Sequence, residues 1–275
     1  RRLCPCPRTR NFSKFLGYRL TQFSENKFFR RPFRAPHHTA SSASLIGGGT
    51  RAMPGEISLA HYGVLFLDEF PEFRKDTLEA LRQPIEDGFV TITRASARST
   101  YPAQFMLVAA MNPCPCGNYG SRITPCRCTA QQIQRYRNRI SGPMLDRIDI
   151  HVEMGEVGYN DIAGRSCGEP SSAIRARVNA ARAIQTRRYA GMGILFNAQL
   201  TNRMMNQYCV LTSDAESLMK KAFAALKLSA RAYTRLLKVS RTIADLAGSE
   251  QIKAEHIAEA IQYRSLESKY WGEIK

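Results

Sequence analysis

The sequence contains no run of 18 apolar residues and no layout typical of a signal peptide. It offers no membrane segment and no export signal, so we expect a soluble, cytoplasmic protein. Acidic residues are also few: 23 Asp and Glu stand against 40 Lys and Arg, and the net charge is +17. Such an excess favours a polyanionic partner, most simply nucleic acid. A solvated basic surface without a specific partner is the alternative.

The phosphate-binding pattern G-x-x-x-x-G-K-[ST] is absent from all 275 residues. In nucleotide sites of that kind, the backbone amides and the lysine of the loop hold the phosphates. We therefore expect this polypeptide alone neither to bind ATP tightly nor to hydrolyse it.

With 44% hydrophobic residues the chain has enough apolar surface for a core. The apolar run at 64–67 predicts a buried strand, and 72–83 has the spacing of an amphipathic helix. Alternation over 89–104 indicates a β-hairpin. Segments 105–111 and 148–154 are candidates for a second and a third strand.

The remaining segments are read from composition and helical spacing. Residues 35–56 have the Ala, Ser, Gly and Pro content of a loop, and 155–170 resemble a linker. Helical patterns follow at 171–189, 213–227, 229–247 and 253–263, with no convincing strand. We expect an atypical basic segment over 1–30, an α/β domain over 31–154 and a helical domain over 171–275.

Two adjacent carboxylates, Asp68 and Glu69, end the first predicted strand in "GVLFLDEF". A buried parallel strand delivers the residues that follow it to the ligand-binding edge of an α/β sheet. There Asp68 would suit Mg²⁺, and Glu69 would orient and deprotonate a water directed at a phosphate. A strand followed by an ordinary polar turn is the alternative for this short pattern.

Three further residues support a nucleotide site. Asn112 ends the second predicted strand, Arg147 precedes the third, and Arg231 lies in the first turn of a basic amphipathic helix. An arginine at this edge can act on a nucleotide held by a neighbouring subunit. A solvated basic helix face is the alternative for Arg231.

Six segments together resemble a known family: "RRPFRAPHHTAS", "PGEISLAHYGVLFLDEFPEF", "LEALRQPIEDG", "FMLVAAMNPCPCG", "SGPMLDRIDIHVE" and "LSARAYTRLLKVSRTIADLAGS". They resemble the magnesium-chelatase-like AAA+ ATPases of the ComM/YifB type, over about residues 31–264. The resemblance implies a partial AAA+ αβα sandwich, from the Walker B strand onward, followed by an all-helical lid. It also implies a homo-oligomeric ring, expected to be a hexamer, that couples ATP hydrolysis to movement on DNA, as in branch-migration helicases.

The resemblance assigns roles to matching positions. It places the Walker B motif at 64–69, with Asp68 for Mg²⁺ and Glu69 as catalytic base, and sensor 1 at Asn112. The arginine finger falls on Arg147, with the nearby Arg139 as an alternative, and sensor 2 falls on Arg231. The hairpin resembles the presensor-1 insertion that faces the ring's central pore. We expect Arg94 and Arg98 to contact DNA there; a solvated hairpin tip is the alternative.

The N-terminal segment departs from this resemblance. In the family, the phosphate-binding loop lies just before a segment similar to the opening "RRL", and residues 4–29 match the family poorly. We expect a copy that is truncated or disturbed in frame, with only half of the nucleotide site present.

Four cysteines surround a loop in "NPCPCGNYGSRITPCRCT": Cys114, Cys116, Cys126 and Cys128. Two C-x-C pairs suit tetrahedral Zn²⁺, in a structural site with no open position. Reduced free thiols and a disulfide are the alternatives. The adjacent His37 and His38 have no acidic neighbour in sequence, and we interpret them as loop-ordering or interface residues, with DNA contact as the alternative.

Three functions from different classes remain. The chain is most of an AAA+ module from a ComM-like DNA-remodelling ATPase, or a basic, zinc-stapled remnant that binds nucleic acid without ATP. A magnesium chelatase subunit is less favoured, because nothing in the sequence indicates a porphyrin site.

Overall fold

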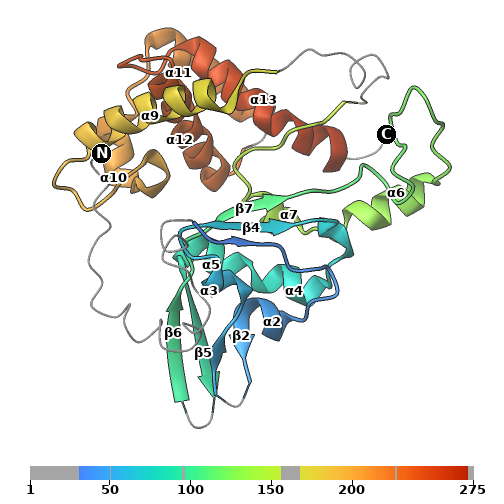
Figure 1. The fold of residues 1–275 in the computed structure, drawn as a ribbon. Helices are drawn as coiled ribbons and strands as arrows, with labels where there is room; N and C mark the ends of the chain where they lie inside the picture. The colour runs from blue at the N-terminus through green and yellow to red at the C-terminus, as the bar shows by residue number, and fades with distance from the viewer. Residues whose placement is uncertain (1–30, 50, 95–96, 156–167, 227, 272–275) are drawn as a thin grey trace.

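The computed structural model describes residues 31–49, 51–94, 97–155, 168–226 and 228–271. The expected basic segment and most of the linker lie outside these ranges. Figure 1 shows an α/β part, from which a hairpin projects, beneath a cluster of helices. This arrangement is compatible with an AAA+-like fold followed by a helical domain, and it confirms the predicted fold class.

A parallel sheet of three strands organises the α/β part. Its strands are β1 (Phe33–Arg34), β4 (Val64–Leu67) and β7 (Met106–Ala109), in the order β1-β4-β7. Leu67 of β4 pairs with Ala109 of β7, so the two longer strands end at the same edge. The strands predicted at 64–67 and 105–111 are confirmed. The two residues of β1 are too few to give a sequence pattern.

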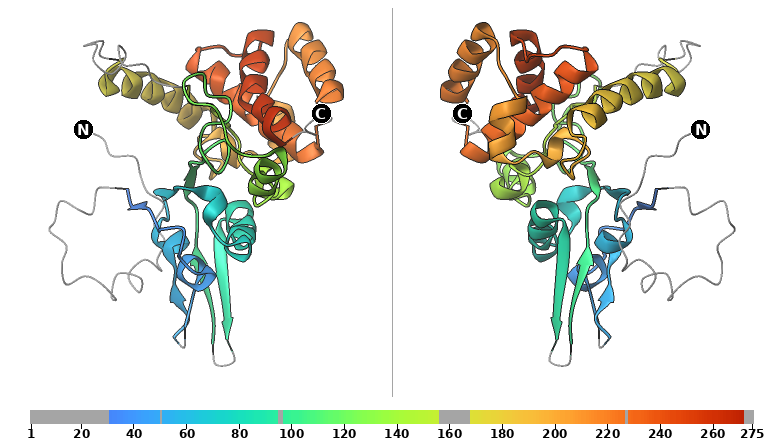
Figure 2. Two further views of the ribbon diagram at one scale, coloured as in Figure 1. Left: turned by 90° about the vertical axis from the view of Figure 1, so that its right-hand side faces the viewer. Right: turned by 90° about the vertical axis from the view of Figure 1, so that its left-hand side faces the viewer.

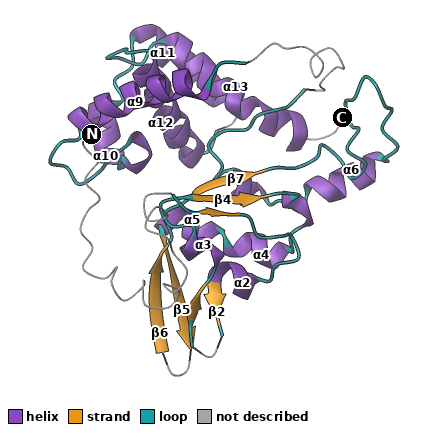
Figure 3. Ribbon diagram, in the orientation of Figure 1, coloured by secondary structure: helices purple, strands orange, loops and turns teal. Residues whose placement is uncertain are grey.

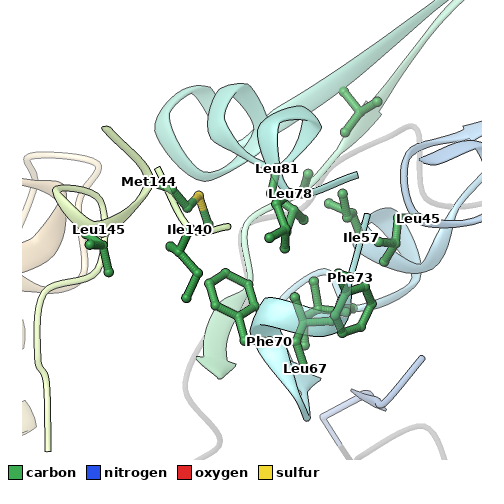
Figure 4. Close-up of a cluster of buried hydrophobic side chains, with 14 of the residues drawn as sticks. Leu45, Ile57, Leu67, Phe70, Phe73, Leu78, Leu81, Ile140, Met144 and Leu145 are labelled. Atoms are coloured by element: carbon green, nitrogen blue, oxygen red, sulfur yellow. The ribbon is translucent and has the colours of Figure 1, made fainter. Parts of the chain in front are cut away.

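Short helices cover this sheet and enclose its core. The predicted helix over 72–83 is a 3₁₀ turn, η3 (Phe70–Glu72), followed by α4 (Lys75–Ala80) and α5 (Arg82–Asp87). Pro84 lies in the first turn of α5, where its missing amide donor costs no helical hydrogen bond. Figure 4 shows how the side chains of these helices and of β4 gather around Phe70. Burying each such side chain contributes about 1.5–3 kcal/mol.

The segment expected to be loop at 35–56 contains short elements instead. They are α2 (Ser42–Ile46), β2 (Gly47–Gly48), β3 (Met53–Pro54) and the start of α3 (Glu56–Leu59). Strand β2 pairs with β3 in antiparallel fashion. Gly47 has a φ of 109°, and a Cβ there would lie 2.4 Å from the carbonyl oxygen of Met53. Glycine therefore permits the close contact between β2 and β3. The same glycine content had made residues 35–56 look like a loop in the sequence.

The predicted hairpin is confirmed as β5 (Phe89–Arg94) and β6 (Ala97–Pro102), with Thr91 opposite Thr100. Val90 and Ile92 are buried in the core at its base. Figures 1 and 2 show the two strands projecting away from the rest of the molecule. Residues 95 and 96, at the tip, lie outside the described residues.

The third strand predicted at 148–154 is wrong. Residues 150–155 have no regular secondary structure, and the alternate apolar side chains of Ile150, Val152 and Met154 are 49%, 64% and 85% exposed. Their alternation matched a strand pattern, but no neighbouring strand pairs with them. The amide of His151 instead donates to the carbonyl of Tyr263. The segment thus joins the sheet part to the helices.

The helices past the linker form a second core. They are α9 (Ser171–Arg188), α10 (Asn202–Tyr208), α11 (Ser213–Ala225), α12 (Ala230–Leu246) and α13 (Ala254–Trp271), with the 3₁₀ turn η4 (Asn197–Gln199). Figure 3 shows them as a purely helical group. Their buried side chains form one cluster that includes Leu236, Ala244 and Ile257. Four of these helices match predicted ones; the seven residues of α10 were missed.

Arginines from the helical group contact the α/β part. Arg264 donates to the carbonyl of Ile148 over 3.1 Å, and Arg235 donates to the carbonyl of Arg147 over 2.7 Å. Among the described residues, no helix is both long enough and apolar enough to cross a membrane.

Candidate nucleotide and metal sites

The Asp68 and Glu69 carboxylates lie where the sequence predicted, directly after β4 at the edge of the sheet. Both side chains are exposed, and Oδ1 of Asp68 accepts a hydrogen bond from the amide of Glu69. The amide of Phe70 donates to the carbonyl of Ala110, which ties this turn to the end of β7. Two carboxylates fixed at the edge of a parallel sheet suit Mg²⁺ and a water molecule.

Glu69 has an unusual backbone conformation. Its φ is 51° and its ψ is 46°, in the left-handed region that costs a residue with a Cβ about 1–2 kcal/mol. Oε2 of Glu69 lies 2.7 Å from Nδ1 of His38, and the centroid of the His38 ring lies 4.1 Å from that of His37, with the rings tilted by 35°. Glu69 is thus held by a strained turn and by a histidine from a distant loop, as functional residues often are.

This histidine contact was missed in the sequence, where we found no acidic neighbour for the pair. The acid comes from 31 residues further along the chain, because β1 and β4 are parallel neighbours whose following loops meet at one edge. The short β1 carried no signal that would have placed His38 there.

Asn112 follows β7 by three residues, at the same sheet edge as Asp68. Its side chain is exposed, and its backbone is hydrogen-bonded to the phenol of Tyr136. Burial raises the pKa of Tyr136, assisted by the nearby Glu72. The predicted sensor therefore lies on a strand end that α6 (Ala130–Arg137) buttresses.

Arg147 and Arg231 converge on one carboxylate. Nη2 of Arg147 lies 2.6 Å from Oε2 of Glu86, and Nη2 of Arg231 lies 2.8 Å from Oε1 of the same residue. Hydrogen bonding from Arg147, followed by its charge and that of Arg231, outweighs desolvation and lowers the pKa of Glu86. Sequence reasoning missed Glu86, although it lies within the motif "LRQPIEDG".

The two candidates for the arginine finger differ in exposure. The side chain of Arg147 is only 7% exposed and also donates to the carbonyl of Pro143. That of Arg139 is 48% exposed and donates to Oε2 of Glu72 and to the carbonyl of Pro71. To reach a second subunit, Arg147 would have to leave Glu86, whereas Arg139 already faces solvent.

Of the two predicted DNA contacts, Arg98 is exposed on β6, opposite Thr93. Arg94 pairs with Ala97 at the end of β5. Both positions belong to the outer end of the projecting hairpin, far along it from the core (Figure 2).

The four cysteines meet as predicted. The Sγ atom of Cys114 lies 3.4 Å from that of Cys116 and 3.7 Å from that of Cys126, and all four sulfurs lie within 4.8 Å of one another. A tetrahedral zinc with Zn–S bonds of about 2.3 Å has sulfurs about 3.8 Å apart, so this arrangement fits Zn²⁺. It does not fit a disulfide, whose sulfurs are about 2.05 Å apart, and the cysteines are free.

Local hydrogen bonds prepare one of these thiols for a metal. Backbone N–H groups of Asn118 and Arg127 donate to Cys116 and lower its pKa to about 6. Desolvation, together with the neighbouring thiols, raises the pKa of Cys128 to about 12. A thiolate is the ligand that zinc requires, so one ligand is available near neutral pH before the metal binds.

Two family models match successive parts of the chain. The model of magnesium chelatase, subunit ChlI, matches residues 11–162, and that of magnesium chelatase, subunit ChlI C-terminal, matches residues 168–264. The chain belongs to the magnesium chelatase ChlI family. The first match begins at residue 11, so it includes most of the segment that we expected to match the family poorly.

Curated relatives confirm the predicted ComM/YifB resemblance. Competence protein ComM of Haemophilus influenzae is 50% identical over 238 residues, which cover 86% of this chain and 46% of that protein. Uncharacterized protein YifB of Salmonella typhimurium is 46% identical over 244 residues, 88% of this chain and 47% of that protein. The chain thus spans about half the length of the curated relatives it matches.

A more distant relative is the zygotic DNA replication licensing factor mcm6-A of Xenopus laevis. It is 23% identical over 247 residues, which cover 82% of this chain and 28% of that protein. The chain is therefore a ComM-like member of the ChlI family, with a remote similarity to a replication factor.

Proposed function

We propose that this chain supplies the Walker B, sensor and lid half of an ATP-dependent DNA-remodelling machine of the ComM type. The observation that carries the proposal is the pairing of Asp68 and Glu69 at the end of β4 with Asn112 after the adjacent β7. Asp68 would hold Mg²⁺, which supplies charge neutralisation at the phosphates. Glu69 would orient and deprotonate the attacking water, and Asn112 would position it.

The arginines would complete the site between subunits. Arg147 and Arg231 share Glu86, so the two arginines lie together, and Arg147, which is only 7% exposed, would have to leave Glu86 to act. In a homo-oligomeric ring this pair would face a nucleotide held by the neighbouring subunit, with Arg147 as the finger and Arg231 as sensor 2. The projecting hairpin would contact DNA through Arg94 and Arg98.

The four cysteines would hold a structural Zn²⁺. Their sulfur separations are those of a tetrahedral site, and four protein ligands leave no position open for a substrate. The ion would fix the loop between β7 and α6, and with it the backbone around Asn112.

The test joins this chain to a phosphate-binding loop, whose sequence pattern does not occur in these 275 residues. The matching region of the Haemophilus ComM relative is replaced by this chain, and ATP hydrolysis is measured with and without Glu69→Gln. Hydrolysis that Glu69→Gln lowers by 100-fold or more supports the proposal. Hydrolysis unaffected by Glu69→Gln contradicts it. The chain alone, titrated with a fluorescent ATP analogue and Mg²⁺, is expected to bind weakly and independently of Asp68.

A second function is favoured by the net charge of +17 together with the absent phosphate-binding loop. In that case the chain binds nucleic acid without using ATP. Two results together would support this alternative. Arg98→Ala would lower the affinity for an oligonucleotide, and the chimera would not hydrolyse ATP.

A further inference from the structure

The surface beside the cysteine cluster carries a basic groove, which shares Arg139 and the edge of the cysteine cluster with the sites described above. It consists of two adjoining cavities of about 460 and 420 Å³ that share Glu72, Arg135 and Arg139. Arg127 and Cys128 line the first cavity, and Arg74 and Lys75 line the second. We call this surface the α6 groove. Its lining holds five cationic side chains and one carboxylate.

Most of this positive charge is not neutralised locally. Glu72 is the only acid in the lining, and Arg139 already holds it over 2.6 Å. Arg74 contacts Asp76 over 3.3 Å. Arg127 and Arg135 are exposed, and within the described ranges their side chains make no ion pair. The groove therefore presents guanidinium groups that are available to an anion.

The local fold holds these arginines in place. A capping box starts α6, in which Thr129 accepts from the amide of Gln132 and Gln132 accepts from that of Thr129. Arg137 points inward to the carbonyl of Pro113 and lies over the ring of Tyr119. With Arg137 fixed inward, Arg135 is left on the groove side. The cysteine cluster fixes Arg127 in the same way, between Cys126 and Cys128.

Helix stability alone does not account for this arrangement. A cation in the last turn of a helix, such as Arg135, is favoured by the helix dipole. Arg127 lies before the N-terminus of α6, where a cation is disfavoured. Arg135 and Arg139 line the same two cavities, so their like charges lie on one surface, and Glu72 is paired with Arg139 alone. A ligand that brings negative charge would relieve both costs.

We propose that the α6 groove binds phosphates of a nucleic-acid backbone, as a second site separate from the hairpin. Guanidinium groups bind phosphate oxygens in bidentate fashion, and two adjoining cavities offer room for successive phosphates. Tyr136 and Phe73, the two aromatic residues of the lining, are both buried, so neither ring is available for stacking on a base. The groove would therefore bind the charge of the phosphate backbone without selecting a base sequence. Figures 1 and 2 show α6 and the hairpin in different parts of the molecule.

The test measures the affinity of the full chain for labelled single-stranded and duplex oligonucleotides over a series of KCl concentrations. The double variant Arg127→Gln and Arg135→Gln is compared with Arg175→Gln and Arg187→Gln, two exposed arginines of α9. The groove variant is expected to lose at least about 10-fold in affinity at 0.1 M salt. The slope of log K against log salt should fall by about 1–2. Arg127→Lys with Arg135→Lys should retain the slope.

Equal losses in the groove and α9 variants would overturn the proposal, because they would reflect net charge alone. Displacement of the oligonucleotide by millimolar ATP from the wild type but not from the groove variant would also overturn it, since the groove would then take a nucleotide. Arg98→Ala separates this inference from the proposed function. Arg98→Ala can leave DNA binding unchanged while the groove variant lowers it, which supports the groove and not the hairpin. The groove variant can leave it unchanged while Arg98→Ala lowers it, which supports the hairpin and not the groove.

Discussion

Nδ1 of His38 lies 2.7 Å from Oε2 of Glu69, and these two residues join the loops that follow β1 and β4. The contact ties the proposed catalytic base to a histidine pair that had no assigned partner in sequence. It also occurs at a residue whose backbone is left-handed, with a φ of 51°. The backbone of Glu69 therefore carries a cost in conformational energy of about 1–2 kcal/mol.

That cost predicts a stabilising substitution. Asparagine tolerates the left-handed region better than glutamate. Glu69→Asn, made in a His38→Ala background so that loss of the contact with His38 does not mask the effect, should raise the free energy of unfolding by about 1 kcal/mol. Urea denaturation measures the change. Glu250→Asn, at an exposed glutamate with ordinary backbone, is the control. No gain over this control would mean that the turn is not strained.

Glu86 should couple unequally to its two arginines. Arg147 is 7% exposed at the side chain, whereas Arg231 is 45% exposed. Double-mutant cycles of unfolding free energy should give about 1–3 kcal/mol for Glu86 with Arg147, because the guanidinium of Arg147 is buried although Glu86 is 42% exposed. For Glu86 with Arg231 they should give at most about 1 kcal/mol. Equal coupling energies would contradict the difference in burial.

The cysteine cluster predicts one bound zinc per chain. Protein purified without chelator and then dialysed should retain about one equivalent by elemental analysis, and a strong chelator should lower its melting temperature. Cys126→Ala should lose the metal, because three thiolates remain. Cys209→Ala, a buried cysteine of the helical group, should keep it. Metal content that survives Cys126→Ala would place the ion elsewhere.

Asp245 should be the most sensitive acid of the helical group. It is fully buried and accepts hydrogen bonds from Arg188, Arg241 and Asn197. Burial acts to raise its pKa, but the bonds from Arg188 and Asn197 and the charge of Arg241 outweigh it, so the pKa is lowered.

Asp245→Asn should cost about 3–5 kcal/mol in unfolding free energy, since it leaves two arginines without their counter-charge. Glu216→Gln, in the exposed pair with Lys220, should cost far less, because water screens that pair. Both values come from denaturant titrations at pH 7. A cost below about 1 kcal/mol for Asp245→Asn would show that the buried network contributes little.

His151 predicts a loss of stability in mild acid. Desolvation, aided by the charge of Arg264 and opposed by Asp149, lowers its pKa to about 4. The unfolded chain binds this proton near pH 6.5, so stability is full above that pH and falls as the pH drops towards 4. The loss should reach up to about 3 kcal/mol.

Other groups also titrate in this range, so the test compares the wild type with His151→Phe at pH 7 and at pH 4.5. The variant should gain relative to the wild type as the pH falls. A constant difference between the two proteins would mean that His151 is protonated in the folded state as well.

Several parts of the fold could be predicted because their signals are local. The apolar run of β4, the alternation of β5 and β6, and the spacing of α12 each lie within a few residues of sequence. Segment 150–154 has the same alternation, but no strand pairs with it, and pairing is not a local property. Strand β1 and helix α10 were too short for a periodic signal.

The residues of the candidate sites could also be predicted only where their signals are local. Asp68, Glu69 and the cysteines were found because each group is close in sequence or ends a recognisable strand. Glu86 and His38 were missed because their partners lie far along the chain, 61 residues away for Arg147 and 31 for Glu69. Only the folded topology brings such residues together.

Helix α12 has a mechanical consequence. Its 17 residues span about 25 Å, with Arg231 on Glu86 near one end, Arg235 on Asp149 one turn later, and Arg241 on Asp245 towards the other end. The contact of Arg241 with Asp245 lies in the core of the helical group. Arg231 and Arg235 contact residues of the α/β part. One helix thus connects Glu86 of the α/β part directly to the buried Asp245 network of the helical group. A change in the position of Glu86 would therefore reach the core of the helical group through α12.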